Sequence, residues 1–364
     1  MDFFSATKPH LSGVKTYQPG KPIEEVEREY GLKDAIKMAS NENALGPSPK
    51  ALRAIKKNLG KLHRYPDGGC FYLRKKLSEL LNVAPESLVF GNGSDELLIF
   101  AARAFAGKGD QVIIADPTFL IYEIASQVEG AEVVKVPIHN FQYDLDMMRS
   151  HINAKTRMIF IANPDNPVGT YVNDERLRYF LKDVPPRVIV VLDEAYFEYA
   201  CAHKDYPNGM QFLHQYPNLI VTRTFSKAYG LAGLRVGYAV ADVKIANALN
   251  KVREPFNVNL AAQIGAAAAL DDTAHLKKTL RVTEEGRRYL ASELKKLGLR
   301  TVDTATNFML VDLRVEAQPV YEQLLKRGVI VRPMGLWGLK TFLRVTIGRP
   351  SENKRFIETL KKSV

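Results

Sequence analysis

The sequence predicts an α/β fold, with a mostly parallel sheet sandwiched by helices in a large domain and a smaller α+β domain beside it. Two observations predict this class. From about residue 87, short β-branched runs alternate with helical segments, which is typical of a doubly wound parallel sheet. After about residue 272, a long charged helical stretch precedes three short apolar runs, which is typical of a separate α+β unit.

The expected elements follow one another in a regular order. The strands of the large domain are apolar runs that end at polar residues: "SLVFG" (87–91), "DQVIIAD" (110–116), "AEVVKVPI" (131–138), "RMIFIANP" (157–164), "RVIVVLDEA" (187–195) and "NLIVTRTFS" (218–226). The helical segments are 94–106, 119–129, 144–152 and 173–184 in the large domain and 272–298 in the smaller one. The strands of the smaller domain are "NFMLVDL" (307–313), "GVIVRP" (328–333) and "TFLRVTIG" (341–348).

These elements predict how the chain is divided. We expect residues 1–40 to pack with the small domain, residues 41–272 to form the large domain and residues 273–364 to form the small C-terminal domain. The small domain would therefore be built from both ends of the chain.

Composition bounds the class of protein. The chain has 364 residues, of which 46% are hydrophobic and 25% charged, as in a globular protein with a large core. The first residues show no basic start followed by an apolar run, and stretches such as 188–192 are too short to cross a bilayer, so we expect neither a secretory signal nor a membrane span. Cys70 and Cys201 form no CxxC pair, so we expect no metal site and a reducing cytoplasmic location.

The formal charge of +11 does not favour nucleic-acid binding, because the basic residues are interspersed with acidic ones. Segments such as 51–61 have the spacing of amphipathic helices with solvated lysines. The charge is instead suited to steering anionic small molecules.

Polar residues at the strand ends are the candidates for chemistry, because ligands of such sheets lie at the carboxyl ends of the strands. "GNGSDE" (91–96) follows a strand and opens a helix. Gly91 and Gly93 permit a tight turn, Ser94 or Asp95 can cap the helix, and its free N–H groups would make an anion cradle. Taken alone, this stretch also fits an ordinary strand-to-helix turn.

Three further strand ends carry candidate groups. Phe119 places a planar ring after the strand 110–116, and "NPDNPVGT" (163–170) is a loop whose side chains can form hydrogen bonds. Asp193 ends an aliphatic strand, where a carboxylate is either a helix N-cap or the partner of a buried positive charge. The residues alone leave both interpretations open.

"RTFSKAYGLAGLRVGY" (223–238) brings two hydroxyls and two cations to another strand end. Lys227 lies there among small and apolar neighbours, close in sequence to Thr224, Ser226 and Arg235. An ammonium group kept from water usually has a chemical partner.

One ligand, pyridoxal phosphate, explains all five stretches. It requires a lysine for its aldehyde, a carboxylate for its ring nitrogen, a phosphate cup, a flat group against the ring and donors for the phenolic oxygen. A lysine near other cations and away from bulk water has its charged form disfavoured, which suits a covalent bond to the aldehyde. The sequence therefore predicts pyridoxal 5'-phosphate as cofactor, carried by Lys227.

The chain resembles the histidinol-phosphate aminotransferase family of fold-type-I aminotransferases. The resemblance runs from "YQPGKPIEEV" near the N-terminus to "LRVTIG" near the C-terminus and rests on "SNENALGPSP", "RYPDGG", "GNGSDE", "NPDNPVGT", "LDEAY", "RTFSKAYGLAGLRVGY" and "VREPFNVN". It implies a fold-type-I pyridoxal-phosphate transferase, with residues 41–272 binding the cofactor.

The resemblance also implies a role for each matched residue. Lys227 would bond to the cofactor and move a proton, Asp193 would pair with the ring nitrogen, and Phe119 would stack on the ring. Asn166 and Tyr196 would bond the phenolic oxygen, and Asn166 would also face the substrate. The residues implied around the phosphate are Ser94, Asp95, Thr224, Ser226 and Arg235, with Tyr65 reaching the cofactor of a partner subunit. Those implied on the substrate side are Tyr17, Phe256, Arg332 and Arg344.

Two positions depart from the usual family pattern. Asp165 stands where a second asparagine is more common, and Val168 where threonine is more common. Both are compatible with the loop geometry, and Asn166 itself is retained.

The resemblance implies a homodimer with shared active sites that exchanges amino groups between histidinol phosphate and the glutamate/2-oxoglutarate pair. Two alternatives remain open on the same scaffold: an aromatic amino acid aminotransferase and a threonine-phosphate decarboxylase. A binding or regulatory protein without turnover is disfavoured, because a binder has no reason to retain Lys227, Asp193 and Arg235 together.

Overall fold

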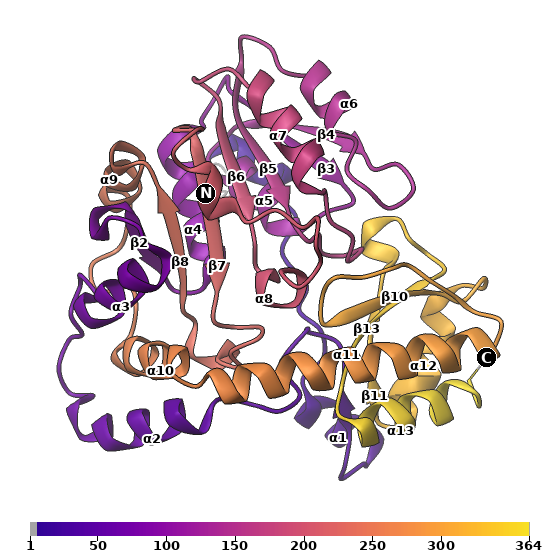
Figure 1. The fold of residues 1–364 in the computed structure, drawn as a ribbon. Coiled ribbons are helices and arrows are strands. Elements are labelled where there is room, and N and C mark those ends of the chain that lie inside the picture. Colours follow the sequence, from indigo (N-terminus) through magenta and orange to yellow (C-terminus); the bar gives the residue numbers. More distant parts are fainter. Residues whose placement is uncertain (1–5, 364) are drawn as a thin grey trace.

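The computed structural model describes residues 6–363 and has a seven-stranded sheet at its centre (Figure 1). Its strands, in spatial order, are β2 (Leu88–Gly91), β8 (Gly237–Ala241), β7 (Leu219–Thr224), β6 (Ile189–Asp193), β5 (Thr156–Ala162), β3 (Gln111–Asp116) and β4 (Glu132–Pro137). Neighbouring strands from β7 to β4 are parallel, and only β8 runs against both of its neighbours. The predicted mostly parallel sheet and fold class are confirmed.

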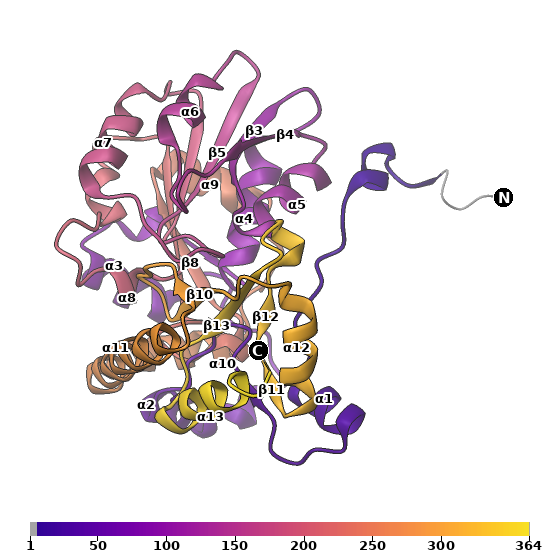
Figure 2. The ribbon, with the colours of Figure 1, turned by 90° about the vertical axis from the view of Figure 1, so that its right-hand side faces the viewer.

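Helices cover both faces of this sheet, which is why its inner strands are apolar throughout. Every residue of β6 and of β7 is buried. Figure 2 shows α6 (Leu145–Ser150) and α7 (Asp174–Asp183) on one side of the sheet, with α4 (Ser94–Phe105) and α5 (Leu120–Val128) on the other. The remaining helices of this part of the chain are α2 (Pro49–Asn58), α3 (Phe71–Leu81), α8 (Phe197–Ala200), α9 (Val243–Lys251) and α10 (Leu260–Leu270).

The smaller unit is an antiparallel sheet packed on helices. Its strand order is β12 (Arg332–Pro333), β13 (Phe342–Thr346), β10 (Phe308–Asp312) and β9 (Arg300–Thr301). Its helices are α12 (Ala317–Lys326), α13 (Pro350–Leu360) and the long α11 (Thr273–Lys296), which runs from the large sheet's side of the molecule to the smaller sheet (Figure 1).

The N-terminal residues contact both units. Helix α1 (Ile23–Tyr30) packs on the smaller unit through Val26, and β1 (Ile36–Lys37) pairs in parallel with β11 (Val329–Ile330). The short 3-10 turn Pro9–Gly13 instead lies against α5, where His10 Nε2 is 3.0 Å from the carbonyl oxygen of Val128. The domain boundaries expected from the sequence stay a prediction.

Within residues 6–363, no helix combines the length and apolarity that crossing a membrane requires. The carboxyl ends of the parallel strands instead meet at one edge of the sheet, facing the smaller unit. Asp193 is the last residue of β6 and Thr224 the last of β7, so the sheet delivers both side chains to this edge.

Candidate active site

A single cavity between the two units gathers nearly all the predicted site residues. Those that line it are Tyr17, Ser94, Asp95, Phe119, Asn166, Asp193, Tyr196, Thr224, Ser226, Lys227, Arg235, Arg332 and Arg344. They come from the N-terminal segment, from the strand ends of the large sheet and from β12 and β13 of the smaller sheet. Segments far apart in sequence are thus brought into one site.

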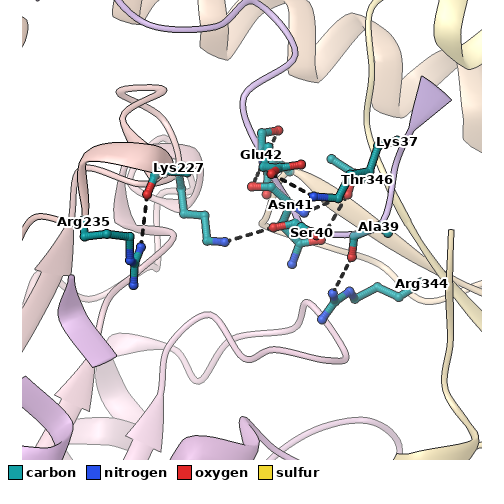
Figure 3. Close-up of polar contacts among 11 residues, drawn as sticks. Lys37, Ala39, Ser40, Asn41, Glu42, Lys227, Arg235, Arg344 and Thr346 are labelled. Atoms are coloured by element: carbon teal, nitrogen blue, oxygen red, sulfur yellow. Dashed lines mark hydrogen bonds and ion pairs between the residues drawn. The ribbon is translucent and has the colours of Figure 1, made fainter. Parts of the chain in front are cut away.

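Lys227 lies in the turn between β7 and β8 and reaches into this cavity. Its Nζ donates a 3.2 Å hydrogen bond to the carbonyl oxygen of Ser40 (Figure 3). The same Nζ lies 5.7 Å from the ring centroid of Tyr196. Burial, and next the positive charge of Arg344, lower the pKa of Lys227 to about 8. The amine is therefore neutral in an appreciable fraction of molecules near physiological pH.

Asp193 is a buried carboxylate held by two hydroxyl groups. Tyr122 donates to its Oδ2 at 2.8 Å, and Thr222 donates to its Oδ1 at 3.0 Å. Within the described part of the chain no cation lies within ion-pair distance of it, and burial raises its pKa to about 6. It does not cap a helix, so of the two interpretations left open by the sequence the geometry favours a partner for a positive charge.

The start of α4 and the turn after β7 form a cradle of donors. Arg235 contacts both sides, since its Nη2 is 3.3 Å from Asp95 Oδ2 and its Nη1 is 3.3 Å from Ser226 Oγ. Gly93 precedes α4 with φ +88°, and a Cβ there would lie 2.5 Å from Arg235 Nη2. Glycine is required at this position both for the backbone conformation and for the close approach.

Residues 39–41 form a connecting segment that touches side chains from both units. Figure 3 shows Lys227 and Arg344 reaching neighbouring carbonyl groups of this segment; Arg344 Nη2 donates to Ala39 O at 2.9 Å. Asn41 donates from Nδ2 to the hydroxyl of Tyr196 at 2.9 Å. The segment therefore fixes Lys227, Tyr196 and Arg344 relative to one another.

Arg332 and Arg344 are buried cations without a carboxylate partner among the described residues. They are 8% and 7% exposed and are directly paired across β12 and β13. Arg332 Nη2 donates to Gln18 O at 2.6 Å, while Arg344 donates from Nη1 to Asn166 Oδ1 and leaves its Nε without a partner. Burial lowers the pKa of Arg344. Two unneutralised guanidinium groups in one cavity favour an anionic ligand.

Asp165, one of the two departures from the usual family pattern, is buried beside the site and accepts hydrogen bonds from three donors. Its Oδ1 accepts from Thr118 Oγ1 at 2.8 Å and from the Tyr143 hydroxyl at 2.7 Å, and its Oδ2 accepts from the Val168 amide at 3.3 Å. Burial raises its pKa to about 6. The carboxylate thereby ties the loop that carries Asn166 to the loop that carries Phe119.

Two predicted site residues do not line the cavity of their own chain. Tyr65 is 84% exposed and Phe256 is 46% exposed. Their rings stack on one another with centroids 4.9 Å apart. Phe256 therefore lies beside Tyr65 at the surface of its own chain, and its placement near the substrate stays a prediction.

Several cavity residues were not identified from the sequence. They are Gly20, Ala39, Ser40, Asn41, Tyr122, Ala162, Pro164, Ala195 and Trp337. Tyr122 lies on the buried side of an amphipathic helix, so the sequence pattern marks it only as a core residue. Asn41 had a signal, since it stands in the "SNENALGPSP" stretch that supports the family resemblance.

The residues fit pyridoxal phosphate. Lys227 offers an amine with a lowered pKa, and Asp193 offers a buried carboxylate without a counter-charge. The start of α4 lies beside Arg235, and the ring of Phe119 lines the cavity. The fold and this cavity define a pyridoxal-phosphate-dependent transferase of fold type I.

Comparisons with known proteins place the chain more narrowly. A family profile described as aminotransferase class I and II matches residues 33–360. Histidinol-phosphate aminotransferase of Moorella thermoacetica is 51% identical over 97% of this chain and 91% of its own, and histidinol-phosphate aminotransferase 2 of Carboxydothermus hydrogenoformans is 46% identical over 96% and 97%. The crystal structure of histidinol-phosphate aminotransferase from Sinorhizobium meliloti with pyridoxal-5'-phosphate superposes with a TM-score of 0.91 at 29% identity and covers 99% of both chains. The chain belongs to the histidinol-phosphate aminotransferase family, within the class I and II aminotransferases.

Proposed function

We propose that the protein transfers an amino group from histidinol phosphate to 2-oxoglutarate, giving imidazole acetol phosphate and glutamate, as a step of histidine biosynthesis. The observation that carries this proposal is the pair of buried, unneutralised arginines, Arg332 and Arg344, in the same cavity as Lys227. The two relatives of 46% and 51% identity that bear the name of this activity support it.

Pyridoxal phosphate, when bound, supplies an aldehyde that condenses with primary amines and a ring that accepts electron density from the carbon bearing the amino group. Lys227 supplies the protein's amine, and its pKa of about 8 leaves Nζ able to act as a nucleophile and then as a base. With substrate bound, Nζ would take the proton from the substrate carbon that bears the amino group.

Asp193 would hold a proton on the ring nitrogen, because a desolvated carboxylate without a cation gains most from pairing with a positive charge there. Tyr196 and Asn166 would donate to or accept from the phenolic oxygen, and Phe119 would stack on the ring; all three line the cavity. The cradle residues Ser94, Asp95, Thr224, Ser226 and Arg235 would hold the phosphate, largely through backbone N–H groups at the start of α4.

The two arginines serve both halves of the reaction. Histidinol phosphate brings a phosphate and no carboxylate, whereas glutamate brings two carboxylates. Guanidinium groups bind either anion in a bidentate manner. Arg344 is the shared anchor, with Arg332 and Tyr17 closer to the phosphate end.

We also infer a homodimer with shared active sites. Exposed large apolar side chains on α2, α3 and the neighbouring turns support it, namely Leu52, Leu59, Leu62, Tyr65, Phe71, Tyr72 and Phe256. Large exposed apolar patches mark interaction surfaces, and twofold dimers are the commonest assemblies. In such a dimer Tyr65, with Phe256 beside it, reaches the partner's cofactor. A cytoplasmic location, inferred from the unpaired cysteines, is part of the same proposal.

The decisive experiment is an assay of the purified protein with histidinol phosphate and 2-oxoglutarate, with phenylalanine and tyrosine as parallel donors. We expect glutamate formation with histidinol phosphate as the preferred donor. A preference for the aromatic donors would establish the aromatic aminotransferase instead. Release of carbon dioxide from threonine phosphate without glutamate formation would establish the decarboxylase.

A further inference from the structure

Trp337 joins the smaller unit to the loop that carries Phe119. It ends the 3-10 turn Gly335–Trp337, which follows β12. Its Nε1 donates a 3.0 Å hydrogen bond to the carbonyl oxygen of Thr118. Thr118 immediately precedes Phe119, so the indole is fixed to the segment that places the stacking ring.

The same indole lies against Arg332. The guanidinium carbon of Arg332 is 5.3 Å from the centroid of the Trp337 ring. A carbonyl oxygen of Gln18 and this aromatic face are the only partners recorded for that buried cation among the described residues. An aromatic face attracts a cation most when water is excluded, so the ring helps determine where the guanidinium points.

Trp337 also separates two cavities. It lines the active-site cavity together with Arg332, and it lines a second cavity with Leu336 and Thr118. Phe119 and Tyr17 are the other side chains common to both. These three aromatic residues therefore lie where the two cavities adjoin.

We propose that Trp337 is a specificity-determining and positioning residue for phosphate-bearing substrates. It holds Arg332 toward the active-site cavity and, through Thr118, fixes the distance between that guanidinium and the Phe119 ring. The phosphate end of the substrate is thereby held at a set distance from the reacting carbon. This inference rests on the proposed function, because it assigns the phosphate to the Arg332 side of the cavity.

The kinetic test uses Trp337→Phe, which keeps an aromatic face but lacks the N–H donor. We expect KM for histidinol phosphate to rise about 3- to 10-fold, which is the loss expected for one hydrogen bond. The value of kcat should be nearly unchanged, because the lost interaction contributes to substrate binding and not to the chemical step. KM for phenylalanine, whose side chain needs no cation, should stay within about 2-fold of the wild type. The matched control is Leu336→Ala, on the same turn but 58% exposed and outside the active-site cavity. Equal losses for both donors, or the same loss in the control, would overturn the proposal.

A second test needs no turnover and no substitution of Trp337. Trp337 is the chain's only tryptophan, so its emission reports this one site. In the holoenzyme, where the cofactor fills the cradle near Arg235, titration with inorganic phosphate should give a saturable change in emission that chloride at equal ionic strength does not give. The change should vanish in Arg332→Ala and persist in Arg300→Ala, an exposed arginine of the same small sheet. No response in the wild type, or an unaltered response in Arg332→Ala, would refute the coupling.

The two tests separate this inference from the proposed function. If the wild type fails to use histidinol phosphate yet shows the phosphate response, the proposed function is wrong and the Trp337–Arg332 site stands. If the wild type uses histidinol phosphate but shows no phosphate response, the proposed function stands and the Trp337–Arg332 coupling is wrong.

Discussion

The hydroxyl of Tyr122 donates a 2.8 Å hydrogen bond to Oδ2 of Asp193, and both side chains are buried. Tyr122 belongs to none of the motifs identified in the sequence. It lies in α5, and its hydroxyl reaches Asp193 at the end of β6. The hydrogen bond stabilises the ionised carboxylate, which burial alone disfavours. The carboxylate proposed to hold the ring nitrogen protonated thus depends on a residue from another element.

We expect Tyr122→Phe to lower kcat/KM by about 10-fold or more, because a hydrogen bond to a charged group contributes roughly 1.5–3 kcal/mol. Loss of this donor raises the pKa of Asp193 above its value of about 6, so the carboxylate is lost at a higher pH as the solution is acidified. The acid limb of the kcat/KM profile should therefore move to higher pH. Tyr143→Phe, which removes a buried hydroxyl from Asp165 instead, is the control and should leave that limb in place.

Asp193→Asn should preserve the fold and slow turnover severely, because a neutral amide cannot hold the ring nitrogen protonated. The matched control is Asp242→Asn, whose side chain caps α9 by accepting from the Lys244 amide. Asparagine caps a helix about as well as aspartate, so this control should be nearly silent. Circular dichroism and steady-state kinetics of both variants decide the matter; near-normal turnover in Asp193→Asn would falsify the assigned role.

Lys227 should carry the cofactor covalently. Borohydride reduction of the yellow holoenzyme should leave a pyridoxyl group on the peptide containing "TFSKAYG". Lys227→Ala should still bind the cofactor through the Arg235 cradle, with almost no transamination, whereas Lys108→Ala, at an exposed turn, should behave as the wild type. Peptide mass spectrometry checks the site, and a label on any other lysine contradicts the assignment.

Arg344→Lys should weaken both histidinol phosphate and glutamate, since each lost charge-assisted contact contributes about 1.5–3 kcal/mol. Arg332→Ala should impair histidinol phosphate more than an aromatic amino acid, whose neutral side chain needs no cation. Comparison of kcat/KM for both donors tests this, with Arg300→Lys as an exposed control on the same sheet. If Arg332→Ala lowered kcat/KM equally for histidinol phosphate and for the aromatic amino acid, Arg332 would have no part in phosphate recognition.

Tyr65 should act in the partner's active site. Neither Lys227→Ala nor Tyr65→Ala homodimers should be fully active, but a verified heterodimer of the two has one site with both groups intact. We expect it to recover about half of the wild-type activity, measured after co-expression with two affinity tags. Absence of recovery would indicate sites built from one chain.

The sequence predicts the fold class and six of the seven strands of the large sheet, β8 being the exception. Of the predicted site residues, all but Tyr65 and Phe256 line one cavity. Lys227 and Asp193 could be identified because parallel strands end at one edge, so short polar motifs after apolar runs must meet there. Local periodicity and motif spacing carry that information without knowledge of any long-range contact.

The surroundings of those groups depend on tertiary contacts that the sequence pattern does not reveal. The spacing of apolar residues in α5 marks Tyr122 as a core residue. Nothing in the neighbouring sequence shows that its hydroxyl donates to Asp193. Trp337 and Thr118 lie far apart in sequence, and the smaller sheet brings them together. The burial of Arg332 without a carboxylate, and the exposure of Phe256 beside Tyr65, depend likewise on which distant segments pack together. Such contacts arise from packing between elements, which no short stretch of sequence encodes.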